Sequence, residues 1–277
     1  MSDNPPALAP RGLACAISLL AALALAACGE GVQELSYKAD SKGKWLAIVD
    51  GPEKAEAGPA KITLDNYADV NADLQLIRVE GEHSRGEVTA AMSRIRNGRP
   101  FPKWFIPAGG VGTLIPGITM TVEQVLQPGT YYAFNATTGP TKLEALTTEV
   151  TGEESQEEIE EGEAKITASE YGYEVGAIPA SEVAEVNFEN VGSQPHHLIV
   201  SFLKGDETAA DLKRSFETEE NIKPEPSFLS AILEPGESQL VKLKMWPGRF
   251  AFYCVLSDRE GGLPHVFKGM IEEVEVE

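Results

Sequence analysis

Five side chains in the second half of the sequence could together hold a metal ion. His196 and His197 open one apolar run, Cys254 closes another, and His265 and Met270 follow closely. Two imidazoles, a thiolate and a thioether form a soft ligand set that suits copper, with the thioether as a weak axial ligand. Hard cations such as Ca²⁺ and Mg²⁺ prefer oxygen ligands. Each residue taken singly is better explained by core packing or a surface position, so the prediction rests on the set.

Short alternating runs must position these side chains. The runs HHLIVSFL and RFAFYC are typical of β-strands. Phe250, Phe252 and Cys254 share one face of their strand, so Cys254 points inward if the phenylalanines face the core. The same parity argument points His196 inward and ranks it above His197. A register slip of one residue would exchange the two histidines.

The sequence predicts two similar halves, each an antiparallel sandwich with one short helix, at residues 87–96 and 206–216. Two pairs of Pro-Gly turns, at 116 and 128 and again at 235 and 247, have the same spacing in both halves. A block of eight Glu at 149–163 predicts a solvated linker. The expected organisation is a signal peptide (1–27), a tether (28–43), a first domain (44–148), the linker (149–163) and a second domain (164–277).

Three segments of the second domain resemble the cupredoxins, the plastocyanin and azurin family of type-1 copper proteins. They are residues 190–196 (NVGSQPH), 248–254 (GRFAFYC) and 265–270 (HVFKGM). The resemblance implies an all-β Greek-key β-sandwich with copper at one end. It also implies that His196, Cys254 and His265 are the trigonal ligands and that Met270 is axial, with His197 as the substitute for His196.

The loop between Cys254 and His265 departs from the family pattern because ten residues separate them, where the family usually has fewer. A longer loop can still close on a metal, since the closure entropy grows slowly with length. A looser loop would also allow a weaker copper site. In the first domain, alignment of the halves puts Ala72, Asp73 and Asn135 at the positions of His196, His197 and Cys254. The first domain is therefore expected to be a degenerate repeat that binds no metal and serves as a spacer or partner surface.

The N-terminus predicts the compartment. Arg11 precedes an apolar run that ends in Leu25-Ala26-Ala27-Cys28. This sequence resembles the lipobox of bacterial lipoproteins, which implies that Cys28 carries a lipid anchor and that the protein lies at the extracytoplasmic face of a cell membrane. An ordinary signal peptide with a chance Cys is the alternative.

The net charge and the histidine count of the chain limit the classes of partner and function that it could have. The chain has 23 Lys and Arg against 43 Asp and Glu, a formal net charge of −20, which excludes nucleic-acid binding and favours a basic redox partner. With only four His, multicopper oxidases, nitrite reductases and most zinc hydrolases are disfavoured, so we expect no enzyme. The sequence predicts a membrane-anchored copper protein that carries single electrons. The alternative is a copper-handling or partner-binding lipoprotein without a redox role.

Overall fold

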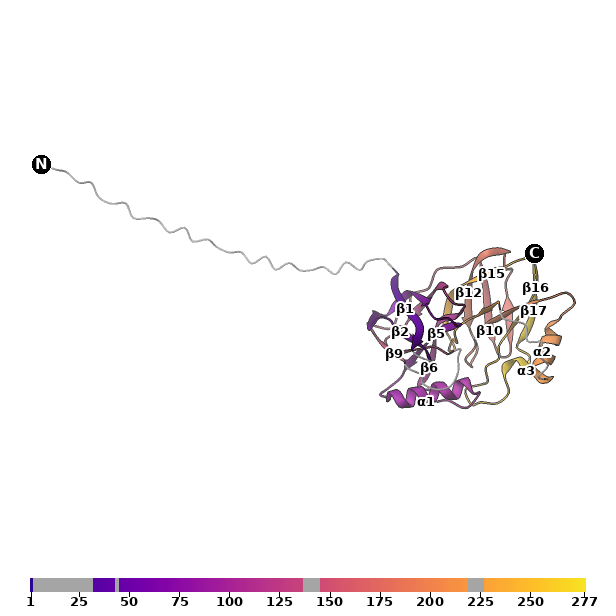
Figure 1. Cartoon of the computed structure of the whole chain (residues 1–277), viewed down its shortest axis with the longest axis horizontal. Coiled ribbons are helices and arrows are strands. Elements are labelled where there is room, and N and C mark those ends of the chain that lie inside the picture. The colour runs from indigo at the N-terminus through magenta and orange to yellow at the C-terminus, as the bar shows by residue number, and fades with distance from the viewer. Residues whose placement is uncertain (2–31, 43–44, 137–144, 219–226) are drawn as a thin grey trace. The chain divides into compact units, whose positions relative to one another are not determined.

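Strands are the main secondary structure of the computed structural model, which describes Met1 and residues 32–42, 45–136, 145–218 and 227–277 (Figure 1). The predicted all-β class is confirmed. Residues 32–277 form one compact unit. The rest of the predicted signal peptide and the predicted lipidation site at Cys28 lie outside the described residues. Within the part of the chain that is described, no helix has the length and apolar character needed to cross a membrane.

The two halves have similar element orders, but β3 occurs only in the first half and α3 only in the second. The first half consists of β1 (Gln33–Lys42), β2 (Trp45–Asp50), β3 (Lys54–Glu56), β4 (Gly58–Asn66), β5 (Ala72–Val79), α1 (Arg85–Arg96), β6 (Phe105–Leu114), β7 (Thr119–Leu126), β8 (Gly129–Phe134) and β9 (Leu146–Thr151). The second half consists of β10 (Ala164–Ser169), β11 (Gly172–Val175), β12 (Ser181–Asn190), β13 (Ile199–Leu203), α2 (Ala209–Thr218), β14 (Phe228–Leu229), β15 (Ser238–Met245), β16 (Gly248–Tyr253), α3 (His265–Lys268) and β17 (Ile271–Val276).

The strand pairing shows that the halves are a structural repeat. In the first half β1 pairs antiparallel with β2 and parallel with β4, and β10 pairs in the same way with β11 and β12. The register repeats as well, because Gln75 lies opposite Phe134 just as Ile199 lies opposite Tyr253. This register gives Asn135 the position that Cys254 has in the second half, as the sequence alignment predicts.

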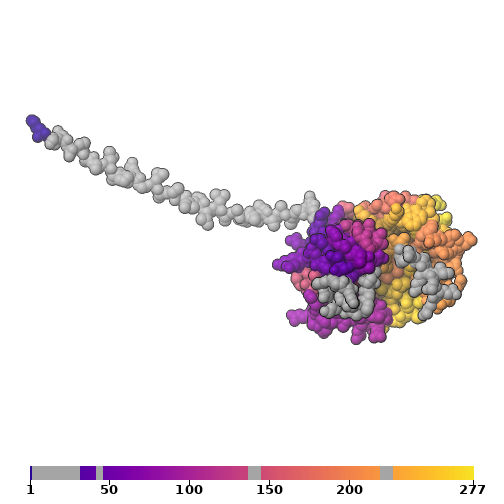
Figure 2. All heavy atoms as spheres, in the orientation of Figure 1, coloured from indigo at the N-terminus to yellow at the C-terminus, as the bar shows by residue number. Residues whose placement is uncertain are grey.

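One sheet continues through both halves. Its eight strands run in the order β11-β10-β12-β15-β7-β4-β1-β2, and β15 pairs with β7 at Gln239 opposite Gln124 and Leu240 opposite Glu123. The other layers are a five-stranded sheet in the first half and a four-stranded sheet in the second. A single hydrophobic cluster contains core residues of both halves, such as Leu74 and Phe252. In the space-filling view the two halves lie directly against each other (Figure 2).

The structure differs from the sequence prediction at the tether. Residues 33–42 form β1, which pairs in parallel with β4 inside the large sheet. Leu35, Tyr37 and Ala39 alternate with exposed polar residues and are buried in the core. This period of two is a strand signal that the polar composition of the segment hides.

The acidic linker is mostly exposed, as expected, but its backbone is attached to the sheets. The Ser155 amide donates to the Gln127 side chain at 3.1 Å, and the Gly162 amide donates to the Asn187 side chain at 2.6 Å. Residues 149–151 belong to β9, so the connection is shorter than predicted.

Both predicted helices are present, with shifted ends. The first begins at Arg85 because Ser84 caps it and Glu87 completes a capping box. The second covers Ala209–Thr218. A third helix, α3, was not predicted, and it begins at His265.

Glu237 lies at the interface between the halves and makes the stability of the protein depend on pH. It is half-buried directly before β15, where it is close to Arg78 of the first half and to Glu234. Burial raises the pKa of Glu237 from 4.5 to about 7, opposed by Arg78 and helped by Glu234. Between these two values the folded protein binds more protons than the unfolded chain, so the free energy of unfolding falls as the pH rises through this window.

Glu237→Gln should remove this pH dependence. The amide mimics the protonated acid, so we expect the variant to match the wild-type protein at pH 4, below both pKa values, and to exceed its stability at pH 8 by up to about 3 kcal/mol. Urea unfolding of both proteins at the two pH values measures the difference. An equal difference at both pH values would contradict the raised pKa.

Candidate metal centre

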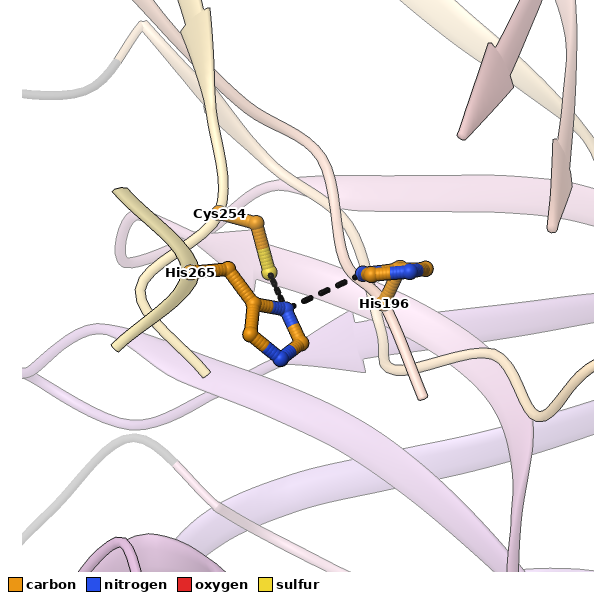
Figure 3. A group of neighbouring side chains, drawn as sticks. All are labelled: His196, Cys254 and His265. Carbon is orange, nitrogen blue, oxygen red and sulfur yellow. Dashed lines mark hydrogen bonds between the residues drawn. The ribbon is translucent and has the colours of Figure 1, made fainter. Parts of the chain in front are cut away.

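The structure brings His196, Cys254 and His265 together (Figure 3). Their ligand atoms lie within 4.8 Å of one another, and all three residues are fully buried. The Nδ1 atoms of the two histidines are 3.1 Å apart, and Cys254 Sγ lies 3.5 Å from His265 Nδ1. Two nitrogen ligands that are each about 2 Å from one tetrahedral ion lie about 3.3 Å apart. The spacing is therefore that of a ligand set able to close on a single ion.

Backbone hydrogen bonds fix each of these residues. His196 precedes β13 and exchanges two backbone hydrogen bonds with Leu233, at 3.0 and 2.8 Å. Cys254 directly follows β16, and its carbonyl accepts from the Val266 amide of α3 at 2.8 Å. The His265 amide donates to Leu256 O at 2.7 Å, which returns the long loop to the site. The three side chains are thus held from separate parts of the fold.

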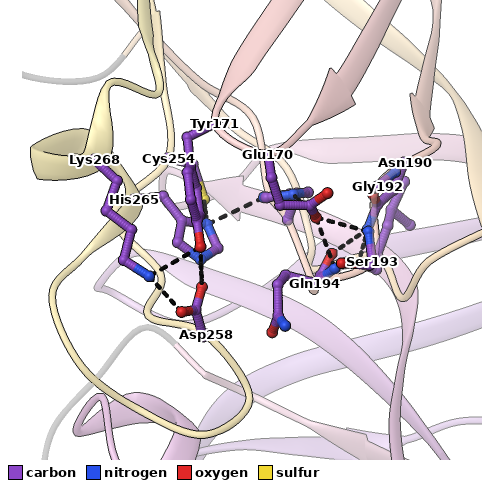
Figure 4. A network of polar contacts seen from close by, with 12 residues as sticks. Glu170, Tyr171, Asn190, Gly192, Ser193, Gln194, Cys254, Asp258, His265 and Lys268 are labelled. Carbon is purple, nitrogen blue, oxygen red and sulfur yellow. Dashed lines mark hydrogen bonds and ion pairs between the residues drawn. The ribbon is translucent and has the colours of Figure 1, made fainter.

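Two carboxylates orient the imidazole rings (Figure 4). Glu170 Oε1 lies 3.3 Å from His196 Nε2, and Asp258 Oδ1 lies 3.1 Å from His265 Nε2. A carboxylate can only accept, so each imidazole carries its proton on Nε2 and leaves the lone pair on Nδ1 free. Such carboxylate–histidine pairs commonly orient metal-ligating histidines.

The carboxylates are charged, while the rings that they contact are neutral. Burial acts to raise the pKa of Glu170, but hydrogen bonds from the Ser193 and Gln194 amides outweigh it, and the pKa is lowered. The pKa of Asp258 is also lowered, because Lys268 and Tyr171 outweigh the effect of burial.

Burial lowers the pKa of both histidines, to about 4 at His265, where the His196 ring adds to the effect. Burial raises the pKa of the Cys254 thiol to about 12, against hydrogen bonds from the His197 and Leu256 amides. At neutral pH the site is therefore formed by two neutral imidazoles and a thiol.

This arrangement fits a bound cation. Two Nδ1 lone pairs face each other at 3.1 Å, which is unfavourable unless a positive charge lies between them. A thiolate at Cys254 would likewise need a cation beside it, since no lysine or arginine side chain among the described residues hydrogen-bonds its sulfur. A metal ion that replaces the thiol proton would satisfy all three groups.

His197 lies outside the group. Its Nε2 accepts a hydrogen bond from the Val255 amide at 3.1 Å. The equivalent amide of the first half, at Ala136, donates to Asp73 Oδ1 at 2.5 Å. The side chains of His197 and Asp73 thus accept equivalent backbone hydrogen bonds. The bond at His197 occupies Nε2, the nitrogen that this residue would otherwise offer to a metal.

Met270 is fully buried, and its backbone joins two of the ligands. Its amide donates to His265 O at 3.0 Å, and its carbonyl accepts from the Cys254 amide at 3.2 Å. The thioether as axial ligand stays a prediction.

In the first half, Asn135 replaces Cys254 and accepts a hydrogen bond from the Asp73 amide at 2.9 Å. The His197 amide makes the corresponding bond to Cys254. The first half thus has the same backbone-to-side-chain hydrogen bond, but with an asparagine in place of the soft cysteine ligand. The fourth histidine, His83, is half-buried and stacks on Trp104 at a centroid distance of 3.7 Å.

Sequence reasoning missed the residues that support the ligands. Glu170 follows β10, far from the ligands in sequence, and no motif marks it. Asp258 lies inside the long loop, and its position between two ligands was the one available signal. The Tyr173 hydroxyl, which donates to His197 O at 2.5 Å and contacts Cys254, was also missed.

No protein-family model matches the chain, and no curated protein matches it either. Among solved structures, it is similar to auracyanin A, a blue copper protein of Chloroflexus aurantiacus, with 18% identity over 43% of this chain and 99% of that chain and a TM-score of 0.32. It is also similar to the Cu-containing nitrite reductase of Thermus scotoductus SA-01, with 15% identity over 89% of this chain and 62% of that chain and a TM-score of 0.27. A third is the blue copper oxidase of Nitrosomonas europaea, with 12% identity, 88% and 85% coverage and a TM-score of 0.23.

These comparisons correct one expectation. The sequence argument against an enzyme was wrong, because structures similar over most of this chain include a reductase and an oxidase. The physical reason is that a histidine count within one chain does not separate carriers from enzymes. One fold hosts both functions, and a second chain can contribute ligands.

The fold and the site together define what the structure shows. The protein has two all-β halves that share one sheet, and the second half holds a buried His-Cys-His group that could bind a metal ion.

Proposed function

We propose that this protein is a copper-binding electron-transfer protein that is anchored by lipid outside the cytoplasm. The observation that supports it is the convergence of His196, Cys254 and His265 with both Nδ1 lone pairs directed inward. Two imidazoles and a thiolate, with Met270 as a weak axial ligand, form the donor set of blue-copper electron-transfer sites.

Bound copper would supply a one-electron Cu(I)/Cu(II) couple. The residues of the chain keep the site the same in both states. Glu170 and Asp258 hold the imidazole rings, and backbone amides hold the Cys254 sulfur. Because all three ligands are fully buried, water is kept from the site and little rearrangement accompanies the transfer.

Anchoring and partner recognition complete the proposal. The lipobox-like sequence at Cys28 supports attachment to the extracytoplasmic face of the membrane. The half-buried Glu170 and Asp258 and the nearby Glu260 surround the histidine edges of the site. These carboxylates and the net charge of −20 favour a basic redox partner whose binding weakens as salt increases.

Copper titration of the metal-free protein tests the function. We expect one Cu(II) per chain, an intense visible absorption band, loss of the band on reduction and its return on oxidation. Titration with Zn(II) serves as the control, because it should occupy the ligands without a visible band. Copper uptake without the band, or no uptake, would show that the proposal is wrong.

A further inference from the structure

The loop that joins Cys254 to His265 is attached to the N-terminal half of the chain. Its ten residues, 255–264, are more than the cupredoxin pattern provides. A free loop of this length would lose conformational entropy whenever the site closed on a metal. Arg259, near the middle of the loop, is only 8% exposed, so this loop is anchored rather than free.

The anchor is the guanidinium group of Arg259. Its Nη1 donates to Pro102 O at 2.9 Å and to Phe105 O at 3.1 Å. Its Cζ lies over the Phe101 ring, 4.4 Å from the ring centre, and its Nη2 pairs with Glu234. The Arg259 carbonyl also accepts from the Phe101 amide at 3.1 Å. All of these contacts except the Glu234 pair are made in the first half, with the segment that joins α1 to β6 and with Phe105, the first residue of β6.

The same residue is linked to His265. Asp258 directly precedes Arg259 in the chain, and Asp258 Oδ1 contacts His265 Nε2 at 3.1 Å. Tyr171 donates to the same oxygen at 2.9 Å. Any displacement of Arg259 therefore moves the carboxylate that orients one ligand.

A second link reaches His196. The Arg259 amide donates to Gln194 Oε1 at 2.8 Å. The Gln194 amide in turn donates to Glu170 Oε1 at 2.8 Å (Figure 4). This oxygen lies 3.3 Å from His196 Nε2. Arg259 is thus connected to both carboxylates that fix the imidazole rings.

We propose that the first half, which has lost the metal ligands, serves as a clamp on the ligand loop of the second half, with Arg259 as the positioning residue. This inference rests on the proposed copper site. The clamp explains how a ten-residue loop holds His265 in place. Its consequence is slow metal release and a ligand geometry that does not relax when the metal is absent.

The clamp requires arginine. Two main-chain carbonyls, a carboxylate and an aromatic ring surround one planar group, and a guanidinium can bond several acceptors while its face stacks on the ring. A lysine would keep the charge beside Glu234 but could not make this set of contacts.

The test compares Arg259→Lys and Phe101→Leu with the wild-type protein. We expect the rate of copper release to a chelator to rise about 10- to 100-fold for Arg259→Lys, the range typical when a partner that orients a ligand is lost. A smaller rise in the same direction is expected for Phe101→Leu, which removes only the ring beneath the guanidinium. Both variants should also shift the visible spectrum and the reduction potential.

Arg249→Lys is the matched control. Arg249 pairs with Glu273 at 2.8 Å and donates to Gly205 O, at the opposite end of the strand that leads to Cys254. It should leave copper release and the spectrum unchanged. Urea unfolding of each metal-free variant separates a loss of global stability from an effect at the site.

A readout without metal completes the test. In the metal-free wild-type protein, ¹⁵N shifts of the imidazoles should report the Nε2–H tautomer at both His196 and His265, and Arg259→Lys should mix the tautomers at His265. If the wild-type protein binds copper but both variants keep its release rate, spectrum and tautomers, the clamp is refuted while the copper site stands. If the wild-type protein binds no copper, the proposed function fails first. If Arg259→Lys does not fold, the release rate, spectrum and tautomers of Phe101→Leu decide whether the clamp exists.

Discussion

Cys254→Ser should eliminate the visible absorption of the copper-loaded protein and lower its copper affinity by more than about 100-fold, beyond the loss typical of a residue that only orients a ligand. A serine hydroxyl is a hard, weakly acidic group, whereas the thiolate is the soft ligand that copper prefers. The residue is fully buried and the side chains are similar in size, so the fold should be retained. Absorption spectroscopy and competition with a chelator measure both effects.

His197→Gln is the control for this experiment. Glutamine can still accept the hydrogen bond from the Val255 amide, and His197 lies outside the converging group. The band should therefore remain. Loss of the band in His197→Gln together with its survival in His196→Gln would reverse the assignment of the two histidines. A band that persists in Cys254→Ser would exclude a thiolate ligand.

Gly112→Ala should destabilise the protein by about 3 kcal/mol or more, at the upper end of the cost of overpacking. Gly112 lies in β6 of the first half, where its missing Cβ would stand 1.6 Å from Leu229 O and 3.1 Å from Ser230 Cα. Both atoms belong to the backbone of the second half, so no side-chain movement can relieve the clash. The two halves must separate locally to admit the methyl group.

The effect should extend to the metal site. Ser230 Oγ accepts from the Leu198 amide, two residues after His196. We therefore expect Gly112→Ala to bind copper more weakly as well. Gly86→Ala is the matched control, because its Cβ would meet only Ser84 Oγ at 3.9 Å and alanine favours the helix α1. Urea unfolding of the three proteins gives the comparison, and equal stability of both variants would contradict the close approach of the halves.

The sequence allowed much of the fold to be predicted because its signals are local and repeated. Alternating runs marked the strands, and the spaced Pro-Gly turns marked the repeat. The alignment of Asn135 with Cys254 agrees with the strand register. Strand parity also ranked His196 above His197, and the structure places His196 in the converging group.

The rest depended on contacts between distant segments. Glu170 and Arg259 have no periodic pattern around them, and their roles arise only when loops from several strands meet. The β1 strand was hidden because Leu35, Tyr37 and Ala39 alternate with polar and charged residues in a segment that is polar on average. The sharing of one sheet by the two halves also left no local trace, since β7 and β15 each look like an ordinary strand.

That shared sheet has a further consequence. Without the pairing of Gln124 with Gln239 and of Glu123 with Leu240, β7 and β15 would both be edge strands with free N–H and C=O groups. Open edges of this kind recruit strands of other molecules and start aggregation. Each half therefore shields the other from self-association, which gives the half without the metal ligands a protective role that is independent of copper.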